Sequence, residues 1–133
     1  MCIDKASTTT VLVIEEHDGI RAALRGLLED EAFRVLDAAD AETAGPMLDH
    51  EHEHVDLMVI NFALPEDAVA EIVRRATTSD PELAVLYLVD AAPADDARLR
   101  VALERARTAF VRWPLSFDDL LVEAQVLLSG RIG

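Results

Sequence analysis

The chain has 133 residues, 51% of them hydrophobic and 29% charged, a composition typical of one globular domain with a substantial core. Its 12 Lys and Arg against 26 Asp and Glu give a formal net charge of −14, which disfavours binding to nucleic acid or to an anionic membrane surface. No apolar run approaches the roughly 20 residues that span a bilayer. Because Cys2 is the only cysteine and the first ten residues lack a signal-peptide core, we expect a cytoplasmic protein.

The first predicted element is an apolar, β-branched run at residues 11–14, which is typical of a strand buried on both faces. A helical pattern follows over residues 18–33, with Asp18 as the candidate cap. Its apolar face comprises Ile20, Leu24, Leu27 and Leu28. The chain therefore opens with a strand that leads into a helix.

The same alternation continues. Residues 33–39 predict a short second strand, and residues 40–50 predict a second helix that Asp40 caps. Pro46 has no backbone N–H, so we expect it in the first turn of this helix or at a kink.

Two further units follow. Residues 55–61 predict a third strand and residues 65–78 a third helix, whose inner face comprises Val69, Ile72 and Val73. Residues 82–90 predict a fourth strand and residues 93–109 a fourth helix, whose inner face comprises Leu99, Leu103 and Ala106.

The last unit begins with a fifth strand at residues 109–114, which Pro114 ends. Ser116 with Asp119 three residues on predicts the start of a final helix, and Gly130 predicts its end. Five strands that alternate with five helices indicate an α/β fold with a doubly wound parallel sheet. We expect residues 1–9 to be a flexible tail and residues 10–130 to form the domain.

In such a fold any ligand site lies at the carboxyl ends of the strands. The residues at these ends are Glu15, Glu16, His17, Asp18, Asn61, Val89, Asp90, Arg112, Trp113 and Pro114. Paired acids beside other strand ends would ordinarily indicate an oxygen-ligand site for a cation such as Mg²⁺.

Three segments, "VLVIEEH", "VDLMVINFALP" and "FVRWPL", resemble the receiver domain of bacterial two-component response regulators, the CheY-like family. The resemblance covers about residues 10–130 and implies a flavodoxin-like (βα)5 fold with strand order 2-1-3-4-5. It also implies a role for five positions. The acid pair that holds Mg²⁺ falls on Glu15 and Glu16, the phospho-acceptor on Asn61, the switch hydroxyl on Val89, and the phosphate-pairing lysine on Trp113.

The resemblance further implies that Phe110 is the switch aromatic and that the peptide bond before Pro114 is cis. It implies an interaction face built from the fourth helix, the fifth strand and the last helix, which serves dimerisation or docking onto an output domain. For Leu120, Leu121 and Val122 in the last helix we expect core positions, because apolar residues at helical spacing are usually buried.

Several of these positions depart from the chemistry of the family. An asparagine amide is not a carboxylate nucleophile, an indole supplies no cation, and a valine has no hydroxyl. Arg112 is expected to point to the opposite face from Trp113, so it does not replace the lysine. Glutamates also fit the octahedral geometry of Mg²⁺ poorly, so at most weak binding is expected at Glu15 and Glu16. Asn61 is instead expected to donate hydrogen bonds to these glutamates.

We therefore interpret the chain as a pseudo-receiver: a non-enzymatic signalling module that needs no cofactor and no phosphoryl group. Its expected partner is a sensor kinase, an output domain or another signalling protein. One alternative is a working receiver that accepts the phosphoryl group on Asp90 or Asp67. Another is a metal-responsive module that uses His50, His52 and His54, although these residues also fit a polar loop.

Overall fold

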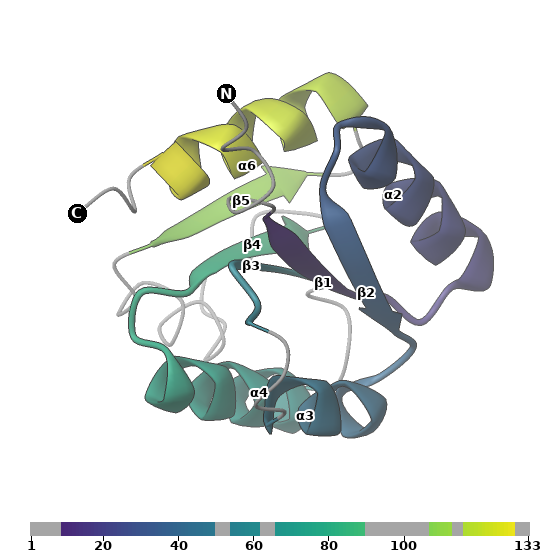
Figure 1. Ribbon diagram of the computed structural model, residues 1–133. Coiled ribbons are helices and arrows are strands. Elements are labelled where there is room, and N and C mark those ends of the chain that lie inside the picture. Colours follow the sequence, from purple (N-terminus) through teal and green to yellow (C-terminus); the bar gives the residue numbers. More distant parts are fainter. Residues whose placement is uncertain (1–8, 50–53, 62–65, 90–106, 113–115, 130–133) are drawn as a thin grey trace.

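The computed structural model describes residues 9–49, 54–61, 66–89, 107–112 and 116–129 (Figure 1). The strands are β1 (Thr10–Ile14), β2 (Arg34–Ala38), β3 (Leu57–Asn61), β4 (Ala84–Val89) and β5 (Thr108–Arg112). The helices are α2 (Asp18–Asp30), α3 (Ala41–Asp49), α4 (Glu66–Ser79) and α6 (Phe117–Ser129). Several predicted features lie outside the described residues: most of the fourth helix with Leu99, Leu103 and Ala106, and also His50, His52, Asp90, Trp113, Pro114 and Gly130.

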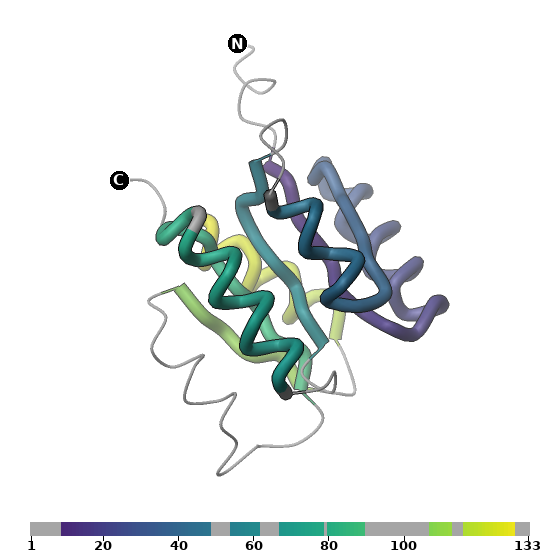
Figure 2. The backbone as a smooth tube through the Cα atoms, turned by 90° about the horizontal axis from the view of Figure 1, so that it is seen from below, coloured from purple at the N-terminus to yellow at the C-terminus, as the bar shows by residue number. Residues whose placement is uncertain are grey.

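The five strands pair in parallel in the order β2-β1-β3-β4-β5, which confirms the predicted doubly wound α/β fold. Every residue of β1, β3 and β4 is buried, because helices cover both faces of the sheet. In Figure 1, α2 and α6 lie on one face, and α3 and α4 lie on the other. Figure 2 views the second face and shows α3 and α4 side by side across it.

Successive strand residues point to opposite faces, so the central strands contribute to two separate cores. The core beneath α3 and α4 takes Leu12, Ile14, Met58, Ile60, Val85, Tyr87 and Val89 from the sheet. The predicted inner face of the third helix, Val69, Ile72 and Val73, is buried in this core. The core beneath α2 and α6 takes Val11, Val13, Leu57, Val59, Ala84, Leu86 and Leu88.

Side chains cap three of the helices. Asp40 caps α3, because Thr43 N donates to its Oδ1 at 2.7 Å, and Ser116 caps α6, because Asp119 N donates to its Oγ at 3.2 Å. Both caps were predicted. The prediction for α2 was wrong: its cap is His17, whose Nδ1 accepts from Ile20 N at 3.1 Å, and Asp18 is the first helical residue.

Two other local expectations can be compared with the structure. Pro46 is the sixth residue of α3, so of its two predicted placements the first turn was wrong and the kink stays a prediction. Val122 on α6 is 55% exposed, whereas Leu120 is fully buried and Leu121 is partly buried. Consecutive helical residues are about 100° apart, so three in a row cannot all face the sheet. Val126, one turn further along, is also exposed.

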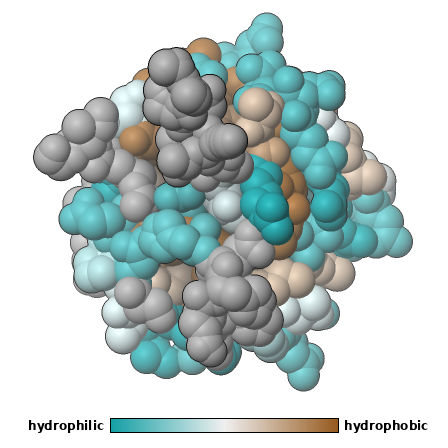
Figure 3. Space-filling view, in the orientation of Figure 1, coloured by the Kyte–Doolittle hydropathy of each residue, from teal (hydrophilic) through white to brown (hydrophobic). Residues whose placement is uncertain are grey.

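The surface of the described part of the chain is mostly hydrophilic in the view of Figure 3, with apolar residues in small areas rather than in one broad patch. None of the described helices is both long enough and apolar enough to cross a membrane.

Candidate functional site

The candidate site lies where β1, β3 and β4 end. Strand pairing aligns Ile14 with Ile60 and Asn61 with Leu88, so the residues that follow or end these strands meet at the carboxyl edge of the sheet. Glu15 comes directly after β1, and Asn61 is the last residue of β3. The fold therefore brings together two polar side chains that are 46 positions apart in the sequence.

Glu15 and Asn61 are both buried, with exposed fractions of 1% and 9%. Asn61 Nδ2 donates a hydrogen bond to Glu15 Oε1 at 2.9 Å. Glu15 Oε2 accepts a second one from the backbone N–H of His17, also at 2.9 Å. A buried carboxylate is costly unless donors match its oxygens, and here each oxygen has one. The expected hydrogen bond from Asn61 to a glutamate is thus present for Glu15.

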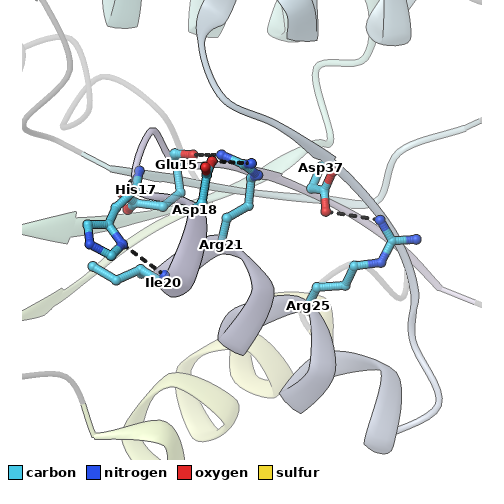
Figure 4. Close-up of polar contacts among 7 residues, drawn as sticks. All are labelled: Glu15, His17, Asp18, Ile20, Arg21, Arg25 and Asp37. Atoms are coloured by element: carbon cyan, nitrogen blue, oxygen red, sulfur yellow. Dashed lines mark hydrogen bonds and ion pairs between the residues drawn. The ribbon is translucent and has the colours of Figure 1, made fainter.

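Arg21, in the first turns of α2, reaches back over the loop between β1 and α2 (Figure 4). Its Nη1 donates to the backbone carbonyl of Glu15 at 2.9 Å, and its Nη2 pairs with Asp18 Oδ1 at 2.7 Å. The helix adds a backbone bond from Arg21 N to His17 O at 2.9 Å. We call Glu15, His17, Arg21 and Asn61 the Glu15 site.

The other predicted positions are less closely grouped. Glu16 is exposed, whereas Glu15 next to it is buried. Val89 ends β4 with its apolar side chain in the core beneath α3 and α4, and Arg112 ends β5 exposed to solvent. Asp67 is exposed in the first turn of α4. Sequence reasoning therefore identified Glu15 and Asn61 as neighbours, and Glu16 does not share their burial.

Phe110, the predicted switch aromatic, is partly buried in the middle of β5. Its ring stacks on that of Tyr87, with centroids 5.4 Å apart and planes inclined by 23°. Tyr87 is fully buried on the neighbouring strand, so Phe110 packs against the core beneath α3 and α4.

A second polar contact joins α2 to the edge strand β2. Arg25 Nε donates to Glu29 Oε2 at 3.0 Å. Its Nη1 pairs with Asp37 Oδ2 at 2.9 Å, and Figure 4 shows this second contact. The hydrogen bonds to Glu29 and then to Asp37 raise the pKa of Arg25 above its ordinary value. Arg25 lies one turn beyond Arg21 on the same helix, and its ion pairs are made with Glu29 and Asp37.

The only described histidine of the "DHEHEH" segment lies at the opposite edge of the sheet. His54 Nε2 is 3.5 Å from both Asp56 Oδ1 and Asp80 Oδ2, which precede β3 and β4. We call these three residues the His54 cluster. Within the described ranges, no group of three or more His, Cys, Asp or Glu residues is arranged to hold a metal ion.

Sequence reasoning missed Arg21, and it placed His17 at the end of the first strand without its capping role. The spacing of Arg21, three residues after Asp18 and six after Glu15, was the available signal, because a side chain in the first turns of a helix lies over its N-terminal loop. The capping role of His17 carried no comparable signal, since histidine is not among the usual capping residues.

A parallel sheet in the order β2-β1-β3-β4-β5, with polar residues at the carboxyl ends of its central strands, defines a flavodoxin-like α/β domain. A sequence model of the response regulator receiver domain matches residues 11–125, and the chain belongs to this family. It is therefore a receiver domain of two-component signalling.

The relatives of this chain are mostly longer proteins. It is 27% identical over 124 residues to the transcriptional regulatory protein PhoP of Escherichia coli (strain K12), covering 92% of this chain and 53% of PhoP. It is 26% identical over 124 residues to a cyclic di-GMP phosphodiesterase of Thermotoga maritima, covering 92% of this chain and 32% of that protein. The chain thus spans about half the length of PhoP and less of the phosphodiesterase.

Solved structures agree on the fold. The CheY-like receiver domain from Methanospirillum hungatei JF-1 superposes with a TM-score of 0.78 at 19% identity, covering 94% of this chain and 97% of that one. NtrX from Brucella abortus superposes with a TM-score of 0.76 at 21% identity, covering 93% of this chain and 28% of that one.

Proposed function

We propose that this receiver domain is a pseudo-receiver, which does not accept a phosphoryl group by the usual route and signals through protein contacts alone. The observation that carries the proposal is the hydrogen bond between Asn61 and buried Glu15. Asn61 ends β3, where the resemblance to receivers places the phospho-acceptor. An amide there offers no carboxylate oxygen to attack phosphorus.

The environment of Glu15 supports the proposal. Both of its carboxylate oxygens accept hydrogen bonds from the protein, one from Asn61 and one from the backbone of His17. A cation that used these oxygens would compete with both donors, and Mg²⁺ also requires near-ideal octahedral geometry. We therefore propose no cofactor, with Mg²⁺ binding at most weak at Glu15 and Glu16.

Two other positions support it by their chemistry. Val89 ends β4 without a hydroxyl, so it cannot hydrogen-bond a phosphoryl group. Trp113 stands where receivers have a lysine, and an indole does not neutralise a transferred phosphoryl group. The formal charge of the pocket positions is unchanged: three acids and one lysine in receivers give −2, and Glu15 with Glu16 and no lysine at position 113 also give −2.

The proposed partner is a protein of a signalling pathway: a sensor kinase, an output domain or another signalling protein. The proposed interaction face includes β5 and α6, and Val122 and Val126 of α6 are exposed on it. The same face is proposed to form the interface of a homodimer. The formal charge of −14 argues against nucleic acid as a partner of this domain. We further propose that the domain is not an enzyme and acts in the cytoplasm.

The proposal is tested by incubating the protein with Mg²⁺ and acetyl phosphate and measuring its intact mass. We expect no phosphoryl adduct on the wild type or on Asn61→Asp, because the latter restores the nucleophile without the lysine. Adding Trp113→Lys and Val89→Thr to Asn61→Asp is the matched control, in which we expect an adduct. Labelling of the wild type would favour acceptance on Asp67 or Asp90. Labelling of Asn61→Asp alone would contradict the proposal that the replacements at Val89 and Trp113 also prevent phosphorylation.

A further inference from the structure

The Glu15 site depends on the conformation of the short loop segment between β1 and the start of α2, residues 15–18, in which Asp18 is the first helical residue. This loop supplies the buried carboxylate of Glu15 and also the His17 N–H that binds Oε2 of that carboxylate. Backbone geometry in the loop therefore decides whether the Glu15 side chain is held toward Asn61. A residue that fixes the loop acts on the site without touching Asn61.

Arg21 contacts both ends of this loop. Its guanidinium is planar with donors in a fixed fork, and the two Nη atoms bind the Glu15 carbonyl and the Asp18 carboxylate (Figure 4). The Arg21 side chain is only 20% exposed, whereas that of Asp18 is 88% exposed. An exposed ion pair contributes little, so the partly buried, charge-assisted bond to the Glu15 carbonyl is the more important contact.

The first turn of α2 reinforces the same geometry. Ile20 N donates to His17 Nδ1 at 3.1 Å and Arg21 N donates to His17 O at 2.9 Å, so His17 is held from the helix side. The His17 N–H is thereby directed at Glu15 Oε2. Arg21 takes part in this arrangement through its backbone and through its side chain.

We infer that Arg21 is the positioning residue of the Glu15 site: its guanidinium holds the loop between β1 and α2 so that the Glu15 carboxylate stays hydrogen-bonded to Asn61. This inference rests on the proposed function and deepens it, because it names what keeps the site in its hydrogen-bonded arrangement. The hydrogen bonds of the Arg21 side chain go to the Glu15 carbonyl and to Asp18 rather than to the Glu15 carboxylate, so it acts through the loop.

The side-chain amide signals of Asn61 in a ¹⁵N-correlated NMR spectrum test the inference. Glu15→Ala removes the acceptor and defines the full displacement of these signals. We expect Arg21→Ala to displace them in the same direction and to a comparable extent. We expect a smaller displacement for Asp18→Asn, which leaves the bond to the Glu15 carbonyl in place.

The matched control is Arg25→Ala, which removes an arginine of the same helix with its own two ion-pair contacts and should leave the Asn61 signals unchanged. Backbone amide signals of β3 and β4 report whether each variant keeps its fold. If Glu15→Ala displaces the Asn61 signals and Arg21→Ala does not, the role of Arg21 is refuted while the proposed function stands. If Glu15→Ala has no effect, the hydrogen bond is absent, and the role of Arg21 and the observation that carries the proposed function are refuted together.

Discussion

Glu15 at the carboxyl edge of the sheet and the His54 cluster at the amino edge differ in how well their polar atoms are hydrogen-bonded. At the carboxyl edge, Glu15 is buried and each of its carboxylate oxygens accepts a hydrogen bond at 2.9 Å. At the amino edge, His54 is largely exposed and stands 3.5 Å from two carboxylate oxygens, too far for a good hydrogen bond. At this edge the imidazole of His54 is exposed to water, whereas Asp80 Oδ2 is buried without a hydrogen-bond partner among the described residues. Glu15 is shielded from water, so its carboxylate depends on hydrogen bonds from the protein, and both of its oxygens receive one.

The largest effect on the free energy of unfolding should come from removing Asn61, the side-chain donor to Glu15. Asn61→Leu keeps the approximate volume of the side chain but deprives a buried carboxylate of one donor. We expect the free energy of unfolding to fall by about 2–3 kcal/mol, measured by urea denaturation. The double variant Glu15→Leu with Asn61→Leu should lose less than the sum of the two single variants, because it removes the donor and the acceptor together. Additive losses would contradict a direct bond.

The amino edge contains strain that a substitution can relieve. Ala32 lies in the turn between α2 and β2 with φ 71°, a left-handed conformation that favours glycine. Ala32→Gly should therefore raise the free energy of unfolding by about 0.5–1 kcal/mol. Ala23→Gly, at an exposed position inside α2, is the control and should lower it by about 1 kcal/mol. A loss of stability in both variants would refute the strain at Ala32.

A smaller effect is expected at the His54 cluster. Its contacts are long and His54 is exposed, so His54→Leu should change the free energy of unfolding by less than about 0.5 kcal/mol. Urea denaturation of this variant beside Asn61→Leu compares the two edges directly. A loss as large as that of Asn61→Leu would remove the distinction between them.

The smallest effect on stability concerns Asp40, an exposed carboxylate at the carboxyl edge of the sheet. The hydrogen bond from the backbone of Thr43 lowers the pKa of Asp40 below its ordinary value of 3.8. A lowered folded-state pKa adds stability that is present above pH 3.8 and is lost as the pH falls through the folded-state value. Asp40→Asn keeps a capping side chain, so its stability should change less between about pH 6 and pH 3 than that of the wild type. Parallel pH profiles would contradict the capping role of the carboxylate.

The fold was predictable because its signals are local. Apolar, β-branched runs such as residues 57–60 fit strands buried on both faces, and the alternation with helical patterns determines the parallel topology. The pairing of Glu15 with Asn61 followed from the same rule, since parallel strands bring their carboxyl ends to one edge.

The features that were not predictable depend on three-dimensional placement. The contact of His54 with Asp80 requires the register between β3 and β4, which the sequence pattern does not give. The exposure of Val122 depends on how α6 is rotated against the sheet. The capping of α2 by His17 depends on a side-chain rotamer that competes with Asp18 for the same role.

The most direct test of the pseudo-receiver claim is a titration of the ¹⁵N-labelled wild-type protein with beryllofluoride and Mg²⁺, followed by NMR. Beryllofluoride occupies the place of a phosphoryl group on an acceptor carboxylate. With an amide at position 61 and the Glu15 oxygens bound by protein donors, we predict that the backbone amide signals of Glu15, Asn61 and Val89 do not move. A saturable displacement of these signals would show that a carboxylate accepts the ligand and would contradict the account.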